Sequence, residues 1–66
     1  MELVVNGASH CVEEGLSVQG LLDVIGVDSR GIAVECNREI VVRSTYDKTI
    51  LNHGDKIEIV HFIGGG

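Results

Sequence analysis

One segment of this chain has helical periodicity, and the segments on either side of it alternate as strands do. The helical segment carries one apolar stripe at i, i+3, i+4 and i+7, formed by Val18, Leu21, Leu22 and Ile25. Ser17 is placed to cap its start, and Gly26 is placed to end it in the left-handed region. Gly20 lies inside it, where we expect it to let the helix approach the sheet closely. A single amphipathic helix buries its stripe against one face of one sheet, so the sequence predicts an α+β fold.

Five strand-like segments accompany the helix, at residues 2–5, 8–13, 32–36, 39–42 and 56–63. Asn6-Gly7, between the first two, is a strong hairpin signal because both residues tolerate positive φ. Residues 44–51 are polar, and we expect a single helical turn anchored by Tyr46, Ile50 and Leu51. The predicted order is strand, strand, helix, strand, short strand, strand.

Size and charge limit the classes of function. Sixty-six residues, 44% of them apolar, make one small domain. The net charge is −5, and an acidic chain repels phosphate backbones, which argues against nucleic-acid binding. The acidity could steer the chain toward a basic partner, but plain solubility is the favoured explanation. We expect a cytoplasmic protein without a membrane partner, because neither a leader nor a bilayer-spanning stretch is evident.

The chemistry-bearing residues do not form a catalytic or metal-binding motif. No two of the cysteines and histidines have the spacing of metal ligands within one element; these residues are Cys11, Cys36, His10, His53 and His61. A phosphate-binding loop is missing as well. We therefore expect no catalytic residue, no metal and no bound cofactor, and a protein that is not an enzyme.

The sequence as given ends in three glycines, Gly64, Gly65 and Gly66, directly behind the last strand-like segment. Residues without side chains cannot pack into a core, so we expect a folded domain at 1–63 and a flexible tail at 64–66. A thin tail tipped with a carboxylate can thread a channel into the active site of another protein. A frayed terminus without a function is the alternative.

The last strand also offers a docking surface. Ile57 and Ile59 are expected to point toward the helix, whereas Val60 and Phe62 point the other way. One helix covers only one face of a sheet, so Val60, Phe62 and the following Ile63 are expected to form an exposed partner-binding surface. Ordinary surface apolarity or self-association would produce the same pattern.

Several stretches resemble the ThiS family, the ubiquitin-like β-grasp sulfur carriers of thiamine biosynthesis. The resemblance lies in residues 3–7, the helix start at 17–22, residues 34–41, residues 54–60 and the terminal glycine pair. The closing Gly-Asp-Lys-Ile-Glu-Ile-Val with its glycines is the most specific part. The sequence departs from the family at Val42, where Pro is common, and at Cys36, where an aliphatic residue is usual.

The resemblance implies a β-grasp roll, ββαββ, with one helix packed on a mixed sheet. The implied strand order is 2-1-5-3, with the first and last strands parallel at the centre. Cys11 and Cys36 would then be separated by two strands, roughly 14 Å at ~4.8 Å per strand, beyond the disulfide reach of about 7 Å. Both thiols are therefore expected to be free.

The resemblance also implies the chemistry of the tail. A ThiF-like enzyme would use ATP and Mg²⁺ to adenylate the Gly66 carboxylate, and a sulfur-mobilising enzyme would help convert it to a thiocarboxylate. A ThiG-like thiazole synthase would then take the sulfur, with Gly64 and Gly65 threading the partner's active site. Two alternatives stay open: the small sulfur-carrier subunit of molybdopterin synthase, and a non-catalytic β-grasp interaction module whose tail is inert.

Overall fold

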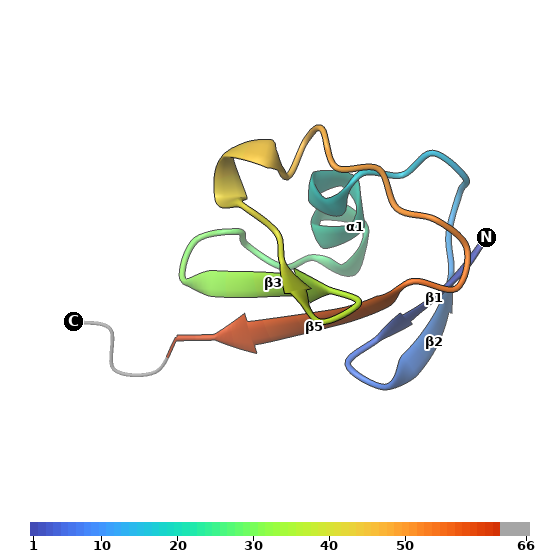
Figure 1. Cartoon of the computed structure of the whole chain (residues 1–66), viewed down its shortest axis with the longest axis horizontal. Coiled ribbons are helices and arrows are strands. Elements are labelled where there is room, and N and C mark those ends of the chain that lie inside the picture. Colours follow the sequence, from blue (N-terminus) through green and yellow to red (C-terminus); the bar gives the residue numbers. More distant parts are fainter. Residues whose placement is uncertain (63–66) are drawn as a thin grey trace.

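The computed structural model describes residues 1–62, which form one sheet with a single α-helix on one side (Figure 1). The elements in order are β1 (Glu2–Val5), β2 (Ala8–Cys11), α1 (Val18–Ile25), β3 (Ile32–Cys36), β4 (Glu39–Ile40), the 3₁₀ turn η1 (Arg43–Thr45) and β5 (Lys56–His61). The predicted α+β class and the predicted order of elements are confirmed.

The sheet has the strand order β2-β1-β5-β3-β4. β1 and β5 run parallel at its centre, with Val5 beside Ile57, and the other neighbouring pairs are antiparallel. This is the order that the family resemblance implied, with β4 added at the edge. Because the first and last strands meet at the centre, the direction in which β5 leaves the sheet is set by the whole fold.

Three strands are shorter than predicted, and for two of them the reason lies in their hydrogen bonds. β2 ends at Cys11 and not at residue 13, because its pairing with the neighbouring strand reaches back only to Met1, whose carbonyl accepts from Val12 N at 2.8 Å. β4 ends at Ile40 and not at residue 42, because Thr45 N binds the Val42 carbonyl at 2.9 Å and starts η1. The third, β5, ends at His61, and Phe62 already lies outside the strand, whereas the prediction ran to residue 63, which lies outside the described residues.

The helix begins and ends where the sequence predicts. Ser17 Oγ accepts from Gly20 N at 3.0 Å, and Gly26 has φ 77° in the left-handed region. Val18, Leu21 and Leu22 of the predicted stripe are buried, whereas Ile25 is only partly buried. The core comprises Leu3, Val5, Val18, Leu21, Leu22, Ile32, Val34, Tyr46, Leu51, Ile57 and Ile59. Within residues 1–62, no helix is long and apolar enough to span a membrane.

We expected Gly20 to let the helix approach the sheet closely, but the atoms nearest to it do not belong to the sheet. A Cβ at this position would meet Leu16 Cδ1 at 2.7 Å and Ser17 Oγ at 3.3 Å. Both atoms belong to the segment that leads into the helix. The glycine therefore makes room for the Leu16 side chain beside the capping hydroxyl.

The connection between η1 and β5 crosses the start of the helix. Tyr46 and Leu51 are buried, as predicted, but the prediction for Ile50 was wrong, because this side chain is 52% exposed. Its neighbours on both sides are bonded to the helix start: Thr49 O accepts from Val18 N, and Leu51 N donates to Leu16 O, each at 2.9 Å. In an extended chain successive side chains point to opposite sides, so the burial of Leu51 turns the Ile50 side chain outward.

Candidate partner-binding site

β5 divides its side chains between the core and the open face, which is the sheet face opposite α1 (Figure 1). Ile57 and Ile59 are buried beneath the helix, with exposed fractions of 1% and 8%. Val60 is 50% exposed, and Phe62, just beyond the strand, is 63% exposed. The predicted division of side chains is confirmed, whereas partner binding by Val60 and Phe62 stays a prediction.

The register of the strands extends this apolar surface across β3 and β4. Ala33 of β3 pairs with Val60 of β5. The β3–β4 hairpin continues the row, because Val41 N donates to Val34 O at 2.9 Å and so brings Val42 opposite Ala33. The result is a transverse row of small apolar side chains on the open face.

Ile40 precedes Val42 on the same side of this hairpin, and the two side chains are 66% and 62% exposed. The apolar patch, as it is called below, consists of Ala33, Ile40, Val42, Val60 and Phe62. Sequence reasoning found only two of its members. Ile40 and Val42 are apolar residues two positions apart, which was a usable signal that they share a face. Their position across β3 from Val60 depends on a register that local sequence does not specify.

The other half of the open face is charged. Glu58 of β5 pairs with Glu35 of β3, and a shallow hollow next to Glu58 is lined by Asn37, Arg38 and Lys56. Apolar side chains thus gather at the end of β5 where the chain leaves the sheet, and charged side chains gather at its start. A partner that approaches the chain end meets the apolar half first.

The chain is bonded to the fold as far as Phe62, whose N–H donates to Gly31 O at 2.9 Å. The loop that carries Gly31 is itself held by polar contacts. Arg30 donates to both carboxylate oxygens of Asp28, at 2.6–3.1 Å, and the Arg43 guanidinium donates to the Ser29 carbonyl. The hydrogen bonds from the Arg30 side chain, followed by the one from its backbone N–H, lower the pKa of Asp28 to about 2.

Four of the predicted site residues lie outside the described residues. They are Ile63, the threading residues Gly64 and Gly65, and the modified residue Gly66. The structure therefore describes the patch at the base of the tail.

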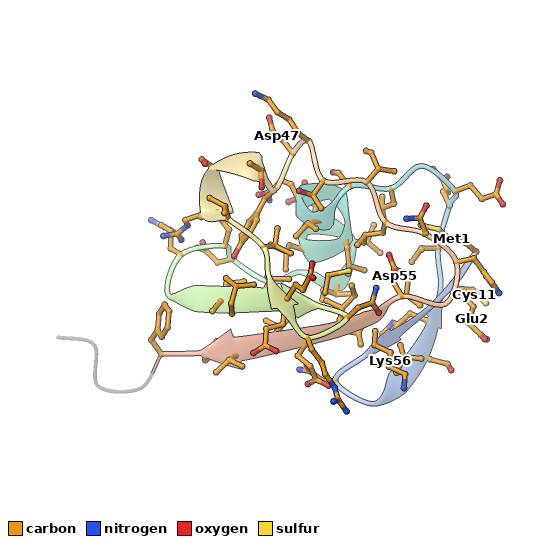
Figure 2. All side chains as sticks on the ribbon, viewed as in Figure 1. Met1, Glu2, Cys11, Asp47, Asp55 and Lys56 are labelled. Carbon is orange, nitrogen blue, oxygen red and sulfur yellow. The ribbon has the colours of Figure 1, made fainter. Side chains whose placement is uncertain are left out.

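The two cysteines lie on β2 and β3, with β1 and β5 between them, as the resemblance implied. Cys11 is exposed beside Glu2 at the edge of the sheet (Figure 2), and both thiols are free. Burial, and next the neighbouring Asp55 carboxylate, raises the pKa of the Cys36 thiol, which keeps it protonated. Residues 1–62 bring together no group of three His, Cys, Asp or Glu side chains fit to hold a metal ion.

A mixed five-stranded sheet covered by one helix, whose last strand leaves past an exposed apolar patch, defines a ubiquitin-like β-grasp domain. The ThiS family model matches residues 2–66. The chain therefore belongs to the ThiS family.

Three similar proteins illustrate the relationship. The crystal structure of the thiamine biosynthesis protein ThiS from Geobacter metallireducens matches with a TM-score of 0.87 and 38% identity, over the whole of both chains. The sulfur carrier protein ThiS of Bacillus subtilis is 40% identical over 50 residues, 76% of each chain. A thiazole synthase of Paramagnetospirillum magneticum is 52% identical over all 66 residues of this chain.

The chain spans about a fifth of the length of the first curated relatives that it matches. It covers 20% of the thiazole synthases of Paramagnetospirillum magneticum and Magnetococcus marinus. In those relatives, the region similar to this domain is a small part of a much longer chain.

Proposed function

We propose that this chain carries sulfur as a thiocarboxylate on Gly66 and delivers it for thiazole formation. The observation that carries the proposal is the position of the patch. Val60 on β5 and Phe62 just beyond it are exposed, and they precede Gly64 and Gly65 by only a few residues in the sequence. A partner that binds the patch therefore lies within a few residues of the Gly66 carboxylate along the chain.

In the proposed first step, a ThiF-like enzyme binds ATP and Mg²⁺, and a Gly66 carboxylate oxygen attacks the α-phosphate. Pyrophosphate leaves, and the product is an acyl-adenylate. A sulfur-mobilising enzyme then supplies sulfur at the sulfide level, which attacks the acyl carbon of Gly66. The bond to AMP breaks, AMP leaves, and the thiocarboxylate is formed. The chain acts as a co-substrate in this scheme, and ATP and the metal ion belong to the partner.

A ThiG-like thiazole synthase is the proposed acceptor of the sulfur. Support comes from the relatives named thiazole synthase, which are 52% and 44% identical to this chain over its whole length. A carrier-like region within a longer synthase fits a carrier that works next to that enzyme. Gly64 and Gly65 suit a narrow passage because a Cβ at either residue would widen the tail.

Intact-mass measurement tests the proposal. The chain is incubated with the adenylating enzyme, ATP, Mg²⁺ and a sulfur donor, and the expected product is heavier by the difference between sulfur and oxygen. The matched control lacks Gly66 but keeps the domain, and it should gain nothing. An unchanged mass of the full chain, under conditions that convert a known carrier, would show that the tail is inert.

A further inference from the structure

The β4 edge of the sheet borders a hollow of about 510 Å³ outside the apolar core. Its walls come from β4, from η1 with the residues after it, and from the turn before β5. Three exposed aliphatic residues line it, Ile40, Val42 and Ile50, at 66%, 62% and 52% exposure. Exposed aliphatic residues around an open hollow mark a binding surface more often than scattered single ones do.

The backbone of this edge is free to pair with another strand. Val41 N points inward, to Val34 O, and peptide groups alternate in direction along an antiparallel strand. The N–H and C=O of Ile40 and the N–H of Val42 therefore point away from β3. Val42 is extended, with φ −68° and ψ 128°, so it continues the edge beyond the two residues of β4.

Two carboxylates give the hollow a negative wall. Glu39 pairs with Cys36, which lies on the helix side of the sheet beside Ile57. Asp55 lies where the chain enters β5 (Figure 2), and its oxygens accept from Asn37 Nδ2 at 3.0 Å and Asn52 N at 2.7 Å. After burial, the charges of Asp55 and Glu39 both contribute to raising the pKa of the Cys36 thiol between them.

Among residues 1–62, no lysine or arginine lines this hollow. The Arg43 guanidinium is bound to the Ser29 carbonyl. Arg38 and Lys56 line the separate hollow beside Glu58 on the open face. The β4 edge therefore combines outward-facing backbone groups and aliphatic side chains with two carboxylates, Glu39 and Asp55, that form no ion pair within residues 1–62.

We propose that this edge binds an extended, basic segment of a partner protein, which adds to the sheet as a short strand beside β4. Side chains of an added strand alternate between the two sides of the sheet. On the open face they meet Ile40 and Val42, which favours apolar residues. On the other side they meet Glu39 and Asp55, which favours lysine, with its aliphatic stem against Ile50. The segment that fits has alternating basic and β-branched residues, and its binding does not depend on the tail chemistry.

NMR titration of the full-length chain tests this inference. The probe is the capped peptide acetyl-Lys-Val-Lys-Val-Lys-amide, and the control peptide has Glu at the three Lys positions. Shift changes are expected at residues 39–42 and 49–52, saturating in the millimolar range. The acidic peptide should bind at least about fivefold more weakly, and added salt should reduce the difference. Absence of changes in these two segments, or equal changes with both peptides, overturns the proposal.

Two variants separate the contributions. Val42→Pro removes an outward N–H at a residue whose φ already suits proline, so binding should weaken about threefold to tenfold while the fold is kept. Glu39→Gln should weaken binding about twofold to fivefold and lower its salt dependence. Val24→Asp, on the exposed side of α1, is the control and should bind as the parent chain does. Parent-like binding by both test variants, each with a native spectrum, contradicts the proposal.

Discussion

The side-chain amide of Asn6 pairs with both peptide groups of Ile59. Asn6 Oδ1 accepts from Ile59 N at 2.7 Å, and Asn6 Nδ2 donates to Ile59 O at 3.3 Å. The amide thereby takes the place of the next residue of β1, at the point where the backbone turns away with φ 47°. The hairpin residue closes the parallel seam between the two ends of the chain.

Asn6→Ala should destabilise the chain by about 1–3 kcal/mol. It leaves the partly buried Ile59 peptide groups without these partners, and it places alanine at a positive φ that asparagine tolerates better. The free energy of unfolding from urea titration measures this loss. Asn6→Gly, which accepts the positive φ, isolates the contribution of the side-chain bonds. If the glycine variant is as stable as the parent chain, the amide bonds contribute nothing.

Gly20→Ala should change stability little in the parent chain. The gain in helix propensity, about 1 kcal/mol, is opposed by the displacement of Leu16, whose Cδ1 lies 2.7 Å from the new Cβ. In a Leu16→Ala background the same substitution should stabilise by about 0.5–1 kcal/mol, because the obstruction is gone. Thermal or urea unfolding of the four chains of this cycle gives the coupling. Equal effects of Gly20→Ala in both backgrounds would show that Leu16 does not restrict the site.

The Asp28–Arg30 pair predicts a specific acid titration. The pKa of Asp28 is about 2, against an ordinary 3.8, so the pair's contribution to stability is complete above pH 3.8 and is lost as the pH falls from 3.8 toward 2. Both side chains are well exposed, at 57% and 86%, so salt should screen the effect. NMR titration of the Asp28 carboxyl should give a midpoint that moves up toward 3.8 in Arg30→Gln. The same midpoint in both chains would show that Arg30 does not set this pKa.

Phe62→Asp should leave the fold intact and lower kcat/KM for adenylation by a ThiF-like enzyme about tenfold or more, because a large exposed apolar anchor at the base of the tail is lost. Val24→Asp, which places the same charge on an equally exposed aliphatic residue of α1, is the matched control. Circular dichroism checks the fold of each variant. Equal rates for Phe62→Asp and the parent chain would remove the patch from the docking surface.

The sequence alone determined the features that depend on near neighbours. The helix begins behind Ser17 and ends at Gly26, because a cap and a left-handed residue act within one turn. Asn6 and Gly7 both adopt positive φ, as their types predicted. Alternation along β5 correctly separated the buried Ile57 from the exposed Val60, since the period of a strand is set by its backbone.

The tertiary structure decided what depends on pairing between distant segments. It placed Val42 beside Ala33 and thereby widened the patch. It also buried Leu51 where the chain crosses the helix start, which turned the side chain of Ile50 outward. It also brought Asn6 to Ile59, 53 positions further along the chain. Register is a property of two strands at once, so a local pattern specifies which side chains share a face, but only the assembled sheet specifies which of them become neighbours.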